Sequence, residues 1–153
     1  MKNIIQISLL AVVMAFQSCV DNSSTFPEDA DGIFYGNLSV DDYAERVGIS
    51  VTENEGSTVD IFFDNVKFAK GMPVRIDITV KGLASQKTDD LLSFSAADVD
   101  PYINKEQTPQ PAYRFSEISG TVKDKELVLS AKMSDDLKGT PAGKRFSFKG
   151  VCK

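Results

Sequence analysis

Apolar and polar side chains alternate along most of this chain with a period of two residues. The clearest run spans residues 74–81, where valine or isoleucine alternates with arginine, aspartate, threonine or lysine. Successive side chains of a β-strand point to opposite faces of a sheet, so such a run has one buried face and one solvated face. The alternation therefore predicts antiparallel β-structure with a single apolar side.

Further runs of the same kind follow one another between turn-forming residues. Within the run 113–122 the apolar residues change phase, which predicts a β-bulge near Ser116 and Glu117, because one extra residue reverses the side chains that follow. No long stretch between strands has helical periodicity, and residues 41–45 are compatible with at most one helical turn. The other runs cover residues 34–40, 47–51, 59–63, 92–94, 127–133 and 146–152.

About eight strands joined mainly by short loops predict one all-β domain. The expected fold is an antiparallel up-and-down barrel of eight strands, and a β-sandwich is the alternative. The segment 98–112 is expected to be an unusually long, proline-containing connection. Long loops either carry function or cover one end of a fold, and both interpretations apply to its apolar residues Tyr102 and Ile103.

The first 18 residues resemble the signal peptide of a bacterial lipoprotein. Lys2 supplies a positive region, residues 4–16 supply an apolar region, and Phe16 to Cys19 resemble a processing box. The apolar region is shorter than the roughly 20 residues that a membrane-spanning helix needs. We therefore expect cleavage before Cys19 and lipidation of its sulfur, which leaves Cys152 without a partner.

The alternative is cleavage by the general signal peptidase after Val13-Met14-Ala15. In that case Cys19 and Cys152 are both available for a disulfide in an oxidising compartment. Residues 20–31 are polar and turn-prone, so they cannot bury enough surface to order themselves. The predicted organisation is a signal peptide at 1–18, a flexible tether at 19–31 and a barrel domain at 32–153, located in the cell envelope and anchored by lipid in the outer membrane.

Composition excludes several classes of function. The chain has 22 acidic and 17 basic residues, a net charge of −5, and neither His nor Trp. An acidic balance argues against binding nucleic acid, which needs a positive field. Without His the commonest general base and metal ligand are missing, no G-x-S-x-G motif occurs, and the inward rows contain no acid. We therefore expect a protein that is not an enzyme and has no cofactor.

The segment 98–106 is rich in side-chain oxygens and invites comparison with a calcium loop. Such a loop must wrap around the ion and usually has a glycine at its sharp turn. Here Pro101 stiffens the chain and no glycine is present. The segment therefore predicts a solvated acidic loop, and no metal site is expected. Cys152 lies in the inward phase of the last run, which is typical of a structural cysteine.

Four segments resemble the calycin-like β-barrel lipoproteins of Bacteroidetes-type bacteria. They are residues 35–40 (YGNLSV), 64–68 (DNVKF), 71–74 (GMPV) and 146–150 (FSFKG), in that order and with similar spacing. Together with the signal segment, the resemblance covers most of the chain. It implies an eight-stranded barrel of lipocalin type on a lipid anchor. It implies little about activity, because a fold does not dictate a function.

Two functions follow from these expectations. The first is a binding module that holds a small apolar ligand inside the barrel, since an eight-stranded barrel has room for its own side chains or for one small ligand. The second is a structural or protein-interaction lipoprotein with a side-chain-filled barrel, which contacts an envelope partner through its outer face or through Tyr102 and Ile103. Phe62 and Tyr35, apolar on faces expected to be wet, favour the second. The candidate ligand-lining residues are Phe34, Leu38, Ile61, Phe63, Ile76, Ile78, Phe115, Leu129, Phe146 and Phe148.

Overall fold

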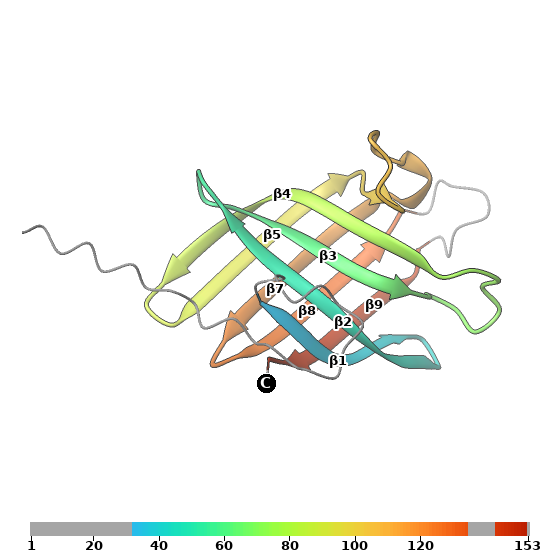
Figure 1. Ribbon diagram of the computed structural model, residues 1–153, viewed down its shortest axis with the longest axis horizontal. Helices are drawn as coiled ribbons and strands as arrows, with labels where there is room; N and C mark the ends of the chain where they lie inside the picture. Colours follow the sequence, from blue (N-terminus) through green and yellow to red (C-terminus); the bar gives the residue numbers. More distant parts are fainter. Residues whose placement is uncertain (1–31, 135–142, 153) are drawn as a thin grey trace, which may run out of the picture.

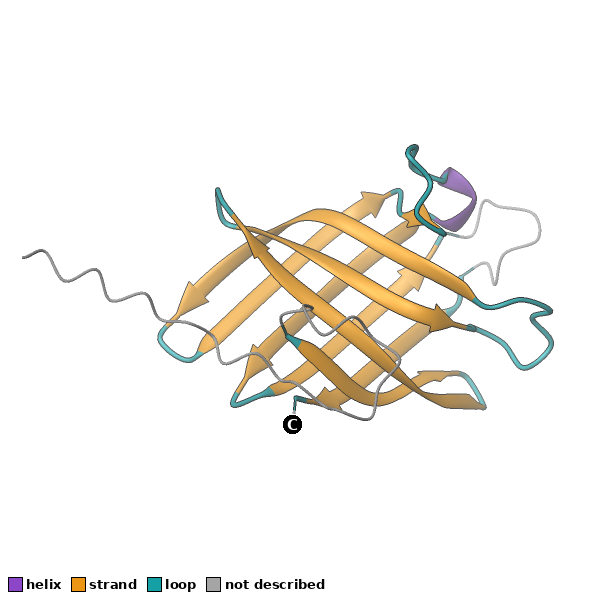
Figure 2. Ribbon diagram, viewed as in Figure 1, coloured by secondary structure: helices purple, strands orange, loops and turns teal. Residues whose placement is uncertain are grey.

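Eight antiparallel strands close into a barrel in the computed structural model, which describes residues 32–134 and 143–152 (Figures 1 and 2). Each strand of the barrel pairs with the next one along the chain, and β1 pairs with β9 to close the sheet. The expected eight-stranded up-and-down barrel is confirmed, and the sandwich alternative is wrong. The strands are β1 (Ile33–Val40), β2 (Tyr43–Asn54), β3 (Thr58–Val66), β4 (Ile76–Thr88), β5 (Leu91–Val99), β7 (Phe115–Lys123), β8 (Glu126–Met133) and β9 (Arg145–Val151).

The register joins the apolar positions of neighbouring strands on the inside of the barrel. Phe34 on β1 pairs with Ile49 on β2, and Ile49 pairs with Phe63 on β3. All three are at most 5% exposed. The predicted bulge is also present, because the pairing of β7 with β8 shifts between Phe115 and Glu117. The alternation read from the sequence is therefore the alternation between core and solvent.

Two local predictions are wrong. Val74 was expected on the buried face of a strand, but it is 59% exposed, because β4 begins only at Ile76. The last pair between β3 and β4 joins Val66 and Ile76, so no neighbouring strand covers Val74. The possible helical turn at 41–45 is instead a two-residue hairpin turn, since Val40 pairs with Tyr43.

The segment 98–112 is shorter as a loop than the sequence suggested. β5 continues to Val99, and a two-residue strand, β6 (Tyr102–Ile103), pairs with β4 beyond the point where β5 leaves it. β6 therefore resumes the pairing that β5 gives up after Ser95. A 3-10 turn, η1 (Pro111–Tyr113), then leads into β7. A strand of two residues is too short to show alternation of period two, so the sequence pattern did not predict β6.

The two ends of the barrel differ. One end carries three tight turns, between β2 and β3, β4 and β5, and β7 and β8; we call it the short-turn end. The other end carries the turn between β1 and β2, the loop 67–75 and the loop 104–114; we call it the long-loop end, at the right in Figure 1. Among the described residues, no polar or charged residue is buried. The fully buried part of the interior is therefore apolar.

Candidate functional site

The ten residues expected to line a ligand site all lie in the barrel core. Each is at most 5% exposed, and together with the other buried apolar residues they form one continuous cluster. Aromatic rings fill the core toward the long-loop end. The ring centroid of Phe146 lies 6.1 Å from that of Phe63 and 5.6 Å from that of Phe115. In this conformation side chains occupy the interior of the barrel.

A fourth ring in this aromatic cluster comes from a loop. Phe68 is 1% exposed and its ring centroid lies 5.0 Å from that of Phe146. It belongs to residues 67–75, which join β3 to β4; we call this segment the stopper loop. Met72 on the same loop packs against the core, whereas Val74 is exposed. The inner side of the stopper loop therefore closes the long-loop end of the barrel.

A single carboxylate, that of Glu45, holds the stopper loop. Glu45 pairs with the buried Leu38 and is in the inward phase of β2, so the expectation that the inward rows contain no acid is wrong. Its Oε1 accepts the backbone N–H of Lys67 at 2.8 Å. Its Oε2 accepts the Tyr43 hydroxyl at 2.8 Å and the Arg75 Nη2 at 2.8 Å. The bonds from Lys67 and Arg75 attach both ends of the stopper loop to β2, and the Tyr43 hydroxyl adds a bond within β2.

The hydrogen bonds also set the protonation of Glu45. Burial opposes ionisation and would raise the pKa of this carboxyl. The N–H of Lys67, the Tyr43 hydroxyl and the Arg75 guanidinium outweigh that effect, so the pKa of Glu45 lies below its ordinary value of 4.5. The side chain is 11% exposed, which means that solvent screens these bonds only in part. Glu45 is therefore ionised and bonded near neutral pH.

Glu45→Gln is expected to lower the free energy of unfolding by about 1–3 kcal/mol at pH 7, since hydrogen bonds to a charged group are lost or weakened. The folded-state pKa is depressed, so this contribution is present above pH 4.5 and is lost as the pH falls through the folded-state pKa. Urea unfolding of both proteins at a series of pH values measures the difference. The gap between them should shrink in acid; a gap that stays constant with pH would contradict the assignment.

Asp64 provides a control, because the pKa of its carboxyl is shifted in the direction opposite to that of Glu45. Burial first, and then the neighbouring Asp77 carboxylate, raise the pKa of Asp64 above its ordinary value of 3.8, although Lys105 opposes the shift. The ionised form is therefore disfavoured in the folded protein, and acid relieves the penalty. Asp64→Asn should leave stability at pH 7 unchanged or slightly higher, by less than about 1 kcal/mol.

A second ion pair, between Asp100 after β5 and Arg114 before β7, joins the two ends of the segment that contains β6. Arg114 donates from Nε and Nη2 to the two carboxylate oxygens of Asp100 at 2.6 and 2.9 Å. These bonds lower the pKa of Asp100 despite some burial. Ile103 is 5% exposed and belongs to the core. Tyr102 is half-buried on the outside, with the Lys81 Nζ 4.4 Å from its ring centroid.

The outer face of the barrel carries a row of serines that sequence reasoning missed. Five of them pair side by side on five adjacent strands, β5, β7, β8, β9 and β1; we call them the serine row. The only signal in the sequence is a serine at one outward position of each strand, and only the register shows that these positions align. The members of the serine row are Ser95, Ser119, Ser130, Ser147 and Ser39.

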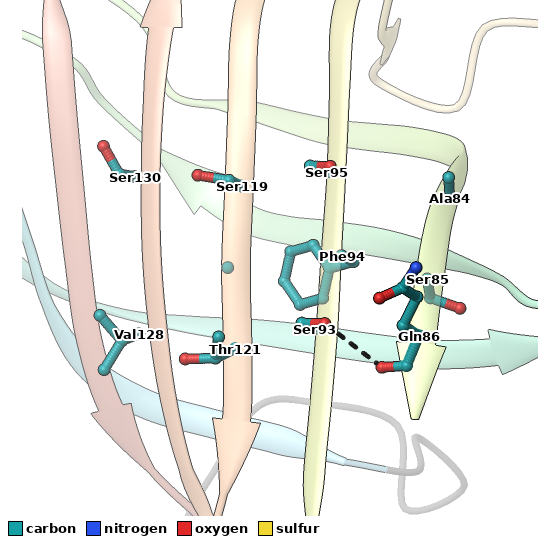
Figure 3. A pocket seen from close by; sticks show the side chains of 11 residues that line it. Ala84, Ser85, Gln86, Ser93, Phe94, Ser95, Ser119, Thr121, Val128 and Ser130 are labelled. Atoms are coloured by element: carbon teal, nitrogen blue, oxygen red, sulfur yellow. Dashed lines mark hydrogen bonds between the residues drawn. The ribbon is translucent and has the colours of Figure 1, made fainter. Parts of the chain in front are cut away.

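An open recess of about 630 Å³ lies over part of the serine row, on the outside of β4, β5, β7 and β8 (Figure 3). No charged residue lines it, although a quarter of the chain is charged. The Ser93 hydroxyl donates to the backbone oxygen of Gln86 at 3.4 Å. The outward side chains that line the recess are Ala84, Gln86, Ser93, Ser95, Ser119, Thr121, Val128 and Ser130.

A second open recess of about 570 Å³ continues along the same face over β8, β9 and β1. It shares Val128 with the first recess and includes Tyr35, one of the two outward aromatic residues noted in the sequence. The other, Phe62, is half-buried on β3, away from both recesses. Val128 and Val151 are 43% and 48% exposed within this area. The outer face thus combines hydroxyl groups with a few exposed apolar side chains.

Cys152 is 7% exposed, as its inward phase predicted, and takes part in a disulfide bond. The chain contains two cysteines, and the other, Cys19, lies outside the described residues. The expected lipidation of Cys19 concerns a residue outside the described part of the chain and stays a prediction.

Two further findings concern only residues 32–134 and 143–152. No group of three or more Cys, Asp or Glu side chains comes together there in a way that could hold a metal ion. No helix in this part of the chain is long and apolar enough to cross a membrane.

Comparison with known proteins gives one structural similarity. No family model and no curated protein matches the chain. The chain is similar to a crystal structure described as a "putative outer membrane protein" of Bacteroides fragilis, with a TM-score of 0.50 and 16% identity. The match covers 77% of this chain and 47% of that one, so this chain spans about half the length of the protein it matches. At this level of identity, what the comparison shows is a shared fold.

Proposed function

We propose that this protein is a non-enzymatic component of the cell envelope that binds another envelope component through its outer face. The filled barrel serves as a rigid support. The observation that carries this proposal is the contrast between the two sides of the sheet: the inside is packed with apolar side chains, whereas both recesses lie outside. The first recess is lined by hydroxyl groups and by no charged residue, which suits a partner that exchanges hydrogen bonds with little desolvation of charge.

The envelope location rests on the sequence. The segment 1–18 has the composition of a lipoprotein signal, and the order of the four segments quoted above resembles the calycin-like lipoproteins. The description of the similar Bacteroides fragilis structure as a "putative outer membrane protein" supports the same location. We propose that lipid on Cys19 holds the mature protein at the outer membrane.

Intact-mass measurement of the protein purified from its host tests the anchor. Lipidation of Cys19 adds the mass of acyl chains to the mature chain. A disulfide between the two cysteines adds no acyl mass and leaves no reactive thiol. The second result would overturn the anchor and leave the binding face untouched.

Site-specific photocrosslinking tests the binding face. A photoreactive phenylalanine analogue at Ser119, in the middle of the serine row, should crosslink a reproducible partner in intact cells. The matched control places the same analogue at Thr52, an exposed outward position of β2 that lies outside both recesses. Equal yields at both positions, or no product at Ser119, would contradict the proposal.

A second candidate function is the binding of a small apolar ligand at the long-loop end. The observation that favours it is that Phe68, a buried part of the aromatic cluster, sits on a loop and not on a strand. A loop can move without breaking the sheet, and its departure would open the core at that end. Native mass spectrometry of protein from its host tests this candidate through a retained small molecule.

A further inference from the structure

The stopper loop is fixed to the barrel at both of its ends and by one side chain. Glu45 accepts the N–H of Lys67, at the start of the loop, and the guanidinium of Arg75, at its end. Arg75 also donates from Nη1 to the backbone oxygen of Asn65 at 2.8 Å. Between Lys67 and Arg75, the backbone hydrogen bond of the loop lies within the loop itself, from Met72 N–H to the Ala69 oxygen at 3.1 Å.

Between its two ends, the loop meets the barrel through apolar side chains. Phe68 lies against Phe146, and Met72 packs against the core. Beneath them lie Phe63 and Phe115, both fully buried. Release of the loop would therefore leave a space with the volume of the Phe68 ring and part of the Met72 side chain, open to solvent on one side and lined by rings on the other.

We propose that Glu45 holds the stopper loop closed through its hydrogen bonds to Lys67 and Arg75, which we call the latch. Release of the latch opens an apolar binding site over the rings beneath the loop, those of Phe63, Phe115 and Phe146. This inference rests on the second candidate function, the binding of a small apolar ligand at the long-loop end. It adds how access to that site is controlled. Glu45 is a positioning residue, because it touches the loop and not the ligand.

The surroundings define the class of ligand. The vacated volume fits one aromatic ring or the end of one acyl chain, since it is left by a phenylalanine and part of a methionine. The described core contains no buried polar side chain, so a polar group at the inner end of a ligand would lose its hydrogen bonds to water without replacement. The ligand therefore enters with an apolar end first and keeps any polar group at the mouth.

The latch controls affinity through the population of the open state. A ligand that binds only the open conformation has an apparent dissociation constant equal to its intrinsic constant divided by the open fraction. Weakening the latch raises that fraction and tightens binding, although it removes favourable contacts. Tighter, saturable binding that is specific to replacement of Glu45, and not merely a loss of stability, is therefore what the proposal requires.

Methionine methyl NMR of the full chain, titrated with toluene, tests the proposal. The chain has four methionines. Met72 lies on the stopper loop, and Met133 pairs with Phe115 at the proposed site. In Phe68→Ala, toluene should shift the Met133 resonance saturably, with a dissociation constant at least tenfold lower than in the wild type.

The latch is tested by Glu45→Gln, which should bind toluene about tenfold more tightly than the wild type. In the Phe68→Ala background the same change should alter binding by less than twofold, because the Phe68 ring that fills the site has already been removed. The matched control is Asp100→Asn, which breaks another guanidinium–carboxylate pair near the same end and should leave toluene binding unchanged. Thermal unfolding and the unliganded spectra show that each variant is folded.

The outcomes separate the two ideas. If folded Phe68→Ala shows no saturable shift at Met133, no ligand site exists there and the second candidate function fails. If Phe68→Ala binds but Glu45→Gln binds no better than the wild type, the site stands and the latch fails. Equal gains in Glu45→Gln and Asp100→Asn would also overturn the latch, since general loosening would explain both.

Discussion

Replacing Phe146 with alanine is expected to lower the free energy of unfolding by about 3–5 kcal/mol, the range for removal of a fully buried phenylalanine. Its ring is 1% exposed and contacts the rings of Phe63, Phe68 and Phe115. These three neighbours belong to β3, to the stopper loop and to β7, so a shift of one strand cannot close the cavity. Chemical denaturation with a fitted midpoint and slope measures the change.

Ser147→Ala is the matched control for this prediction. Ser147 is the next residue on β9 and points outward. Its substitution should change stability by no more than about 0.5 kcal/mol. A loss below about 1.5 kcal/mol in Phe146→Ala would show that the core can collapse around the missing ring, and would argue that the aromatic cluster is loosely packed.

Gly36→Ala is the second substitution with a large expected effect. A Cβ at Gly36 would lie 2.0 Å from the backbone oxygen of Lys149 and 2.4 Å from the Cα of Gly150. Both atoms belong to the backbone of β9, so β1 and β9 would have to separate where they close the barrel. We expect a loss of about 3 kcal/mol or more, at or above the upper end for overpacking. Differential scanning calorimetry of purified protein measures it.

The control for this prediction is Gly71→Ala in the stopper loop. A Cβ there meets nothing within 4 Å, and the loss of a glycine from the unfolded chain favours folding by about 0.4–1 kcal/mol where the backbone is compatible. Gly71→Ala should therefore be neutral or slightly stabilising. Similar losses at both glycines would show that steric contact with β9 is not the cause.

Period-two alternation predicted most of the barrel because it depends on a local property, the direction of successive side chains. The inward rows of β1, β2, β3, β8 and β9 are the rows read from the sequence, and the bulge near Ser116 follows from a change of phase. The same logic failed at Val74, where the alternation continues beyond the last strand pair. Alternation shows which face a residue takes within a strand, but not where pairing stops.

The candidate sites depended on contacts that alternation cannot show. Glu45 and Arg75 are 30 positions apart and meet only because the loop between β3 and β4 folds back over the end of the barrel. The serine row likewise requires the register of five strands, in which a slip of one residue would turn every serine inward. Long-range register and loop placement are tertiary properties, and one sequence does not encode them in a readable local pattern.

By itself, the sequence determined that this chain forms an antiparallel sheet with one apolar side, since each residue's own polarity selects water or core. It also determined that His-dependent chemistry is absent from the whole chain. Only the tertiary structure decided that the interior is filled, that Phe68 reaches it from a loop, and that both recesses lie outside. The physical reason is that packing depends on volume and distance between remote segments, whereas alternation depends only on the order of neighbours.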